Sequence, residues 1–211
     1  MLHARLIEPQ DVRERLASLA EGLSLEVLVK TLRAGVIAYD GTSPLAPPTK
    51  AGTNFWGAAV EHLREELIPL GWELSNKANF PVIISPCETV HIACGRGLNG
   101  TGQFDPDVNP TTRSKKGPRT IAAIHANSRL GQSSFSFIES PKPCKTWFLL
   151  YERDNDRICA ELSLPGSFCD VNFRPDGWIE RIPLPPISVD PSSFDDSNSA
   201  PDFEVTVKRR S

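Results

Sequence analysis

The residues best suited to chemistry lie in one long segment, residues 95–120, which is rich in glycine and in basic side chains. Successive glycines can turn their backbone N–H groups toward an anion, and Arg and Lys side chains contact phosphates. The window 96–120 holds five basic and two acidic residues, a net charge of +3 in a chain of net charge -3. The segment therefore predicts phosphate contacts with nucleic acid or a nucleotide. The candidate phosphate-binding residues are Gly95, Arg96, Gly97, Gly100, Gly102, Arg113, Lys115, Lys116 and Arg119.

Two formal nucleotide-binding motifs almost fit this segment, and both fail at the residues after the glycines. The GxGxxG pattern at 95–100 comes after an expected strand, but the dinucleotide fingerprint needs a helix to open there, and residues 103–110 hold two prolines. The glycine spacing within 97–102 suits a P-loop, yet Gln103 and Phe104 occupy the places of Lys and Ser/Thr. Neither a Rossmann nor a Walker site is predicted. A surface loop with solvated charges is the alternative to phosphate contact.

A second candidate centre consists of two carboxylates, Glu152 and Glu161, which are predicted to share one face of a hairpin. Two carboxylates can hold Mg²⁺ for phosphodiester hydrolysis. A restriction-type nuclease would also carry Lys two residues after the acid, where this sequence has Ser163. His125 is a third, weak catalytic candidate. The alternative function is thus a metal-dependent phosphodiesterase or nuclease, and Mg²⁺ enters only under it; the leading hypothesis needs no cofactor and no metal.

The pattern of apolar residues changes along the chain from helical spacing to alternation. Apolar residues at spacings of three and four predict two helices within 10–34 and a third over 54–68. Gly35 is expected to end the second helix, and Thr53 to cap the third. Helices that precede strands, without βαβ alternation, predict an α+β fold: N-terminal helices followed by a mostly antiparallel sheet with long Gly/Pro-rich loops. The later expected elements are strands at 72–75, 80–85 and 89–94, a helix or alternatively a strand at 121–130, and a short strand or turn at 177–182.

The best-determined element is a β-hairpin over residues 146–164 with Asn155-Asp156 at its tip. The turn fixes the register, and the register places only apolar pairs on one face. The opposite face is half apolar, so something must cover part of it. A third hypothesis is therefore a non-catalytic interaction subunit that docks a protein partner on this hairpin face. The expected pairs are Tyr151 with Ala160, Leu149 with Leu162, and Trp147 with Leu164.

The chain divides into three expected parts. Residues 1–184 form a single α+β domain, residues 185–202 an acidic Pro/Ser linker-like crossing, and residues 203–211 a terminal strand that packs back on the domain. The slightly acidic overall balance excludes bulk electrostatic attraction as the main route to nucleic acid.

Cysteine usage and the distribution of apolar residues indicate the cellular compartment of the protein. The five cysteines lack a CxxC pair, which favours free thiols over disulfides. No apolar run approaches the roughly 18–20 residues that a membrane span needs, and the start of the sequence shows no signal-peptide pattern. We therefore expect a cytoplasmic protein without a membrane partner, and its compactness is typical of a bacterial protein.

Overall fold

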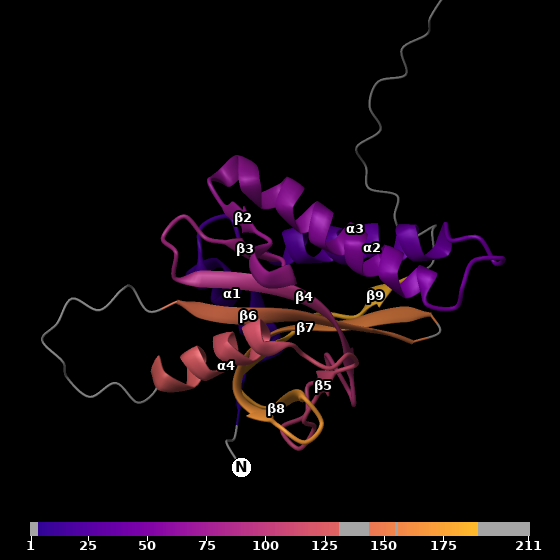
Figure 1. Ribbon diagram of the computed structural model, residues 1–211. Helices are drawn as coiled ribbons and strands as arrows, with labels where there is room; N and C mark the ends of the chain where they lie inside the picture. The colour runs from indigo at the N-terminus through magenta and orange to yellow at the C-terminus, as the bar shows by residue number, and fades with distance from the viewer. Residues whose placement is uncertain (1–3, 131–143, 155, 190–211) are drawn as a thin grey trace, which may run out of the picture.

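A computed structural model describes residues 4–130, 144–154 and 156–189. It has an α+β fold in which helices come first and a mixed, mostly antiparallel sheet of nine strands comes after them (Figure 1). The predicted fold class is confirmed. The helices are α1 (Val12–Leu19), α2 (Leu25–Asp40), α3 (Lys50–Leu67) and α4 (Pro118–Leu130), with short 3-10 helices η1 (Pro9–Asp11), η2 (Ile68–Leu70) and η3 (Lys77–Asn79). The strands are β1 (Arg5–Leu6), β2 (Glu73–Ser75), β3 (Val82–Ile84), β4 (Val90–Leu98), β5 (Thr111–Thr112), β6 (Lys145–Arg153), β7 (Arg157–Cys169), β8 (Arg174–Pro183) and β9 (Ile187–Ser188).

The main sheet has the strand order β1-β8-β7-β6-β4-β3-β2, while β5 pairs with β4 and β9 pairs with β7. Two neighbouring pairs are parallel, β1 with β8 and β4 with β6. The other pairs are antiparallel. Parallel neighbours require a crossover connection, and the connection from β4 to β6 contains α4.

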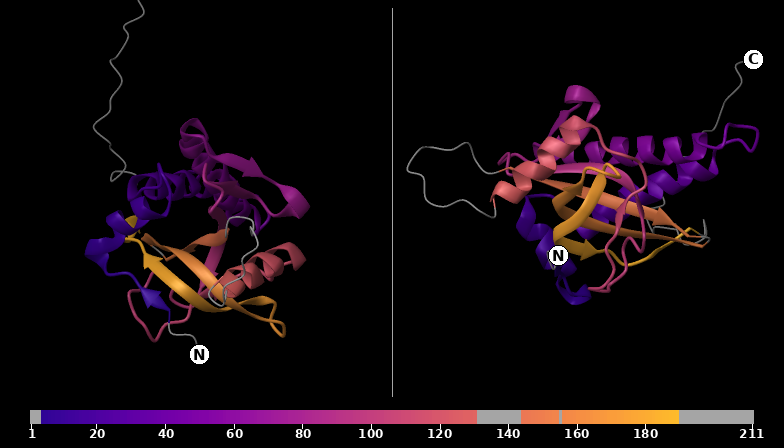
Figure 2. Two further views of the ribbon diagram at one scale, coloured as in Figure 1. Left: turned by 90° about the vertical axis from the view of Figure 1, so that its left-hand side faces the viewer. Right: turned by 60° about the horizontal axis from the view of Figure 1, so that its bottom comes forward.

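Helices cover both faces of the sheet. Helices α2 and α3 lie over one face and α4 lies against the other, as Figures 1 and 2 show. Strand β6 is buried on both sides: Trp147 and Leu149 belong to the larger core under α1 to α3, and Phe148 and Leu150 belong to a smaller core with Ile124 of α4. Burial on both faces explains why β6 reads as a continuous apolar run.

The hairpin register agrees with the sequence prediction. Tyr151 pairs with Ala160 and Leu149 pairs with Leu162 across β6 and β7. The half-apolar opposite face is covered by α4, which packs against both strands, and Phe148 and Leu150 there are fully buried. These apolar side chains are therefore already buried within the chain and offer no docking surface to a protein partner.

Helix α2 runs past the glycine that was expected to end it. Gly35 lies inside α2 and is buried against α3. A Cβ on Gly35 would come within 2.6 Å of the Phe55 ring, so only glycine lets the two helices approach this closely. A glycine required for close approach and a glycine required for a helix end look alike in sequence, which is why this prediction was wrong.

Three further boundaries differ from the sequence predictions. Helix α3 starts at Lys50, ahead of the predicted cap at Thr53. Strand β4 continues through Gly95 and Gly97 to Leu98, residues that were assigned to the loop. Strand β7 continues past Pro165, where a loop was expected; Pro165 still pairs with Trp178, and the register shifts on both sides of it, as is usual for a proline within a strand.

The remaining expectations concern the chain ends, the thiols and the membrane. Strand β1 was not predicted, and of the crossing at 185–202 the structure shows β9. The proposed terminal strand at 203–211 lies outside the described residues. All five cysteines are free, as expected. Across the described ranges, no helix is long and apolar enough to cross a membrane.

Candidate functional site

Strand β4, helix α4 and strand β6 form one βαβ unit, although the sequence suggested none. The two strands are parallel neighbours over seven residue pairs, from Val90–Lys145 to Arg96–Tyr151. Ligands of open α/β sheets bind outside the carboxyl ends of parallel strands, beside helix N-termini. The same arrangement occurs here on a small scale, since the end of β4 and the start of α4 line a common cavity.

The outer edge of β4 is open over a short stretch near its carboxyl end. Strand β3 pairs with β4 at His91 and Ile92, and β5 pairs with it at Gly97 and Leu98. Between them, two carbonyls of β4 accept hydrogen bonds from groups that belong to no strand. Trp56 Nε1 donates to the oxygen of Cys94 at 3.2 Å, and the Arg113 backbone N–H donates to that of Arg96 at 2.8 Å. This gap forms the floor of a cavity.

The cavity over this gap has a volume of about 910 Å³, and we call it the basic groove. Its 24 described lining residues come from α2, residues 48–49, α3, the segment 78–81, β4, β6 and the segment 113–120. None of them is acidic, although Asp and Glu make up 26 of the 211 residues, so that composition alone would give about three. The groove therefore concentrates positive charge in an acidic chain. The five cations are Arg96, Arg113, Lys115, Lys116 and Arg119.

These five are the cations that the sequence proposed for phosphate contact. The segment that carries four of them is held in place by its backbone. Arg174 donates to the carbonyl of Arg113 at 2.8 Å, and the Lys116 N–H donates to the Phe173 carbonyl at 2.8 Å. The Lys115 ammonium lies 5.6 Å from the centre of the Phe173 ring. The segment is thus attached to both β4 and the β7–β8 turn, and it presents its cations on a fixed support.

The glycines are placed differently from the predicted anion-binding nest. Gly95 lines the groove. Gly97 instead packs against Thr101, and Gly102 packs against the backbone of β7 at Ala160. Gly100 and Gly102 have positive φ angles of 80° and 76°, which glycine adopts without strain. These three glycines shape the loop after β4 and do not line the groove.

Lys116 and Arg96 are half-buried, whereas the other three cations are exposed. The Lys116 ammonium is 3.6 Å from the position that a Cβ on Gly95 would occupy, directly over the β4 backbone. Burial lowers the pKa of the Lys116 ammonium from 10.5 to about 8. No hydrogen bond or ion pair of this ammonium occurs within the described residues. A half-buried charge without a partner is unfavourable to the protein alone, so a ligand anion would compensate it.

Two helices begin at the groove, α3 at Lys50 and α4 at Pro118. The N-cap residue of α3, Thr49, makes no side-chain capping bond. A Cβ built on Gly52 or on Gly117 would meet no atom within 4 Å, so the backbone is open to the cavity at both helix starts. Exposed amides and the positive ends of the helix dipoles add to the attraction for anions.

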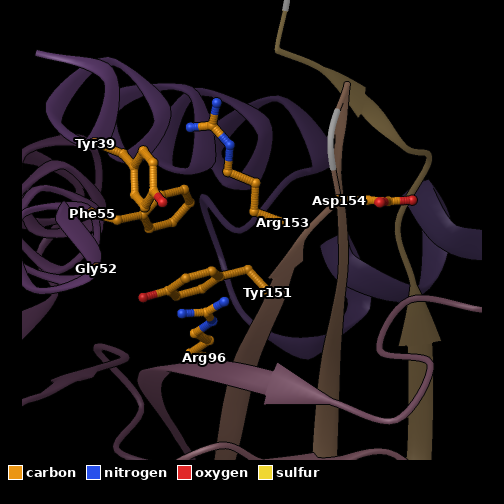
Figure 3. Close-up of a pocket in the computed structure, with 7 residues that line it drawn as sticks. All are labelled: Tyr39, Gly52, Phe55, Arg96, Tyr151, Arg153 and Asp154. Carbon is orange, nitrogen blue, oxygen red and sulfur yellow. The ribbon is translucent and has the colours of Figure 1, made fainter. Parts of the chain in front are cut away.

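A second cavity of about 320 Å³ continues the groove toward the hairpin tip (Figure 3). The two cavities share Tyr39, Gly52, Arg96 and Tyr151. Figure 3 shows Arg96 beneath the Tyr151 ring, while Asp154 points away from the other labelled side chains.

A further cation, Arg153, lies at the far end of this second cavity. Its guanidinium lies 4.4 Å from the centre of the Tyr39 ring and donates to Asp40 at 2.7 Å. Burial raises the pKa of the Cys94 thiol, which lines the basic groove, to about 12. Burial also raises the pKa of the Tyr151 phenol, which lines both cavities. Both groups are therefore held in their neutral forms.

The proposed metal-binding carboxylates are arranged for structure. Glu152 and Glu161 share one hairpin face, as predicted, but Glu161 is completely buried. Its Oε2 accepts hydrogen bonds from Arg181 and from the Gly102 N–H, both at 2.8 Å. Its Oε1 accepts from Ser163 at 2.7 Å and from Arg181 at 3.2 Å. Both oxygens are occupied, so Glu161 is not an open ligand for Mg²⁺.

The other candidates for metal or acid-base chemistry do not complete a centre. Glu152 is partly exposed, and His125 is exposed on α4. In the part of the chain that the structure describes, no group of three His, Cys, Asp or Glu side chains is arranged to hold a metal ion.

Sequence reasoning missed the aromatic wall of the groove. Trp56, Tyr39 and Tyr151 line it, and they come from α3, α2 and β6. One signal was present: Phe55 and Trp56 are adjacent on a helix, so only one of them can face the core. Phe55 does so, and Trp56 remains 38% exposed at the groove. Comparisons with protein-family models, curated proteins and solved structures found no match to the chain.

Proposed function

We propose that the basic groove binds phosphate groups and that the protein acts as a nucleic-acid-binding or nucleotide-binding accessory protein. This proposal rests on one observation: five cations line one cavity, and within the described residues no acidic side chain lines it. A cluster of like charges in a concave, partly desolvated site repels itself and attracts anions strongly. Phosphates, which carry several acceptor oxygens, match both the arginine forks and the lysine ammonium groups.

Two further observations favour phosphate over a simple carboxylate ligand. The groove is within the size range of small-molecule sites, about 300–1,000 Å³, which is larger than a single carboxylate requires. Its cations come from β4, from the 113–116 segment and from α4, so they surround the space on more than one side. Such a site suits a ligand with several charges.

Fluorescence anisotropy with labelled DNA, labelled RNA and fluorescent nucleotides, each at two salt concentrations, tests the proposal. We expect binding at low salt that weakens as salt rises, because each phosphate contact releases counterions. Lys115→Ala combined with Lys116→Ala should weaken binding similarly across sequences. Lys145→Ala is the control, since Lys145 is an exposed cation at the opposite end of the parallel strand pair.

Two outcomes would contradict the proposal. One is the absence of binding to any of these ligands at low salt. The other is equal loss of binding in the Lys145 control and the Lys115/Lys116 variant, which would indicate nonspecific attraction. Incubation of the same labelled strands with Mg²⁺ tests the phosphodiesterase alternative, whose readout is strand cleavage.

A further inference from the structure

We infer that the ligand of the basic groove is a single nucleic-acid strand, which stacks a base on Trp56 while its phosphates contact the groove cations. This inference rests on the proposed function and names its ligand. It is supported by three observations: the fixed and exposed indole of Trp56, the continuation of the groove into the second cavity, and the concave placement of the cations.

Trp56 is positioned as a stacking surface. The chain has four tryptophans; the other three are buried, whereas Trp56 is 38% exposed. Its indole N–H donates to the Cys94 carbonyl at 3.2 Å, which anchors one edge of the ring to β4. A ring that is anchored by one edge loses little further entropy when a base stacks on it. Stacking on aromatic side chains is the usual way in which proteins hold unpaired bases.

Aromatic side chains are also enriched around Trp56. Five of the 24 described lining residues are aromatic, against 16 of 211 in the whole chain, which would give about two. Phe80 is half-buried at the same wall. Of the five rings, Trp56 is exposed, Tyr39 and Phe80 are half-buried, and the other two are buried. Cations beside an accessible aromatic ring are typical of grooves that bind single strands without strong sequence preference. The aromatic residues of the lining are Tyr39, Trp56, Phe80, Phe148 and Tyr151.

The extent of the positive surface favours a strand over a mononucleotide. A nucleotide carries its phosphates at one end, so it engages one local group of cations. Here the cations extend from Arg119 at the start of α4, past Arg96 on β4, to Arg153 in the second cavity. The two cavities are contiguous because they share wall residues. A strand, with one phosphate per nucleotide, can contact cations along this whole path.

The shape of the site disfavours a duplex. Proteins read duplex DNA by placing a projecting helix or strand in one of its grooves. In this protein the cations surround a cavity instead, so the nucleic acid must enter the protein. An unpaired strand can do so, because its bases are free to rotate away from the backbone.

The test compares three probes on the full chain: an oligothymidylate of about 12 nucleotides, a hairpin duplex of the same length, and ATP. We expect the single strand to bind most tightly and to quench tryptophan fluorescence, since Trp56 is the exposed indole. Trp56→Ala should weaken strand binding roughly 5- to 100-fold. Trp56→Phe should retain much of the affinity but lose the quenching. Phe104→Ala is the matched control, because Phe104 is 46% exposed and does not line the groove.

A second pair of variants tests the path along α4. Arg119→Ala should weaken strand binding, whereas Arg129→Ala, ten residues further along the same helix, should leave it unchanged. Thermal melting of each variant identifies any that fail to fold, and quenching of the unmodified protein does not depend on any variant. These measurements therefore remain decisive even if Trp56→Ala unfolds.

The outcomes separate this inference from the proposed function. Tighter binding of ATP, equal binding of the duplex, or strand binding without quenching would overturn the single-strand inference and leave phosphate binding in place. Unchanged strand affinity in folded Trp56→Ala would do the same. No binding of any probe at low salt would overturn both.

Discussion

Two regions of this molecule gather charged side chains, and they do so in opposite ways. At the Arg181–Glu161 cluster, two buried charges meet at 2.8 Å, and the remaining donors of Arg181 bond to the carbonyls of Gln103, Asp105 and Val108. In the basic groove, five cations line one cavity, and no acidic side chain of the described residues lines it. Paired and saturated charges hold a fold together. Gathered charges without partners repel one another, and an anionic ligand would compensate them.

The Arg181–Glu161 cluster also helps to position the basic groove. Arg181 fixes residues 103–108 through their carbonyls, and Trp178 Nε1 fixes the next turn by donating to Pro110 at 2.8 Å. Thr111 then donates to the Pro175 carbonyl at 2.6 Å. These bonds lead directly into the segment 113–116, which carries three of the groove cations. Side chains of β8 whose donors are hydrogen-bonded thus position the loop that carries the groove cations.

Removal of one partner from the buried pair should give the largest effect. Arg181→Met leaves Glu161 buried without its cation and should lower the free energy of unfolding by roughly 3–5 kcal/mol. Glu161→Gln should also be destabilising, because Arg181 then lacks its counter-charge. Urea denaturation followed by circular dichroism measures the change. Glu152→Gln, on the same face but partly exposed, is the control and should change little. A decrease below about 1 kcal/mol in Arg181→Met would contradict the structural role of the pair.

Substitution of the groove cations should have the opposite effect: a large loss of binding affinity and a small change in stability. Arg96→Ala combined with Lys116→Ala should weaken binding of a single strand roughly 10- to 100-fold, and the salt slope should fall by about 0.7 for each phosphate that the variant no longer neutralises. Melting temperature should not fall, since neither side chain forms an ion pair within the described residues and removal of the half-buried Lys116 charge removes an unfavourable desolvation. Anisotropy titrations over a salt series give both numbers. A large drop in melting temperature with unchanged affinity would remove the distinction between the two regions.

Binding should also depend on pH through Lys116. Burial places the pKa of its ammonium at about 8, so the side chain is charged below that pH and neutral above it. Phosphate prefers the charged form, and affinity should therefore fall as pH rises through 8, by at most about tenfold per pH unit. Lys116→Arg should abolish the pH dependence between 7 and about 9.5; persistence of the dependence in that variant would assign it to another group.

The smallest expected effect is a gain in stability. Because burial lowers the pKa of Lys116, the charged form is disfavoured in the folded state, and stability rises as pH increases from about 8 toward the unfolded value near 10.4. At pH 7 the unfavourable charge is present. Lys116→Met should then stabilise the fold by on the order of 1 kcal/mol while it weakens binding. Differential scanning calorimetry measures the first effect. A decrease in stability would show that the ammonium supports the fold, as Arg181 does.

Local sequence patterns predicted the fold well. The predictions failed where a residue's partner lies far away in the sequence. The register of Leu149 with Leu162 is determined by turn residues and alternation within one short segment, so it was accessible. Glu161 looked like an exposed acid because its partner, Arg181, lies on the next strand, and no local signal pairs them. Gly35 was misassigned because helix ends and close helix contacts select the same residue. The groove cations were identified by composition, but their aromatic wall comes mainly from helices far earlier in the chain.

The parallel pairing of β4 with β6 sets the order in which the protein can fold. The connection between these strands spans residues 99–144, and β6 cannot reach its neighbour until that whole stretch has been synthesised. The loop that carries the cations also depends on β8, where Arg181 bonds to the carbonyls of residues 103–108. Contacts so distant in sequence form slowly. A nascent chain that ends before β8 therefore carries the cationic segment without this part of its support, and the groove is among the last features to be completed as the protein leaves the ribosome.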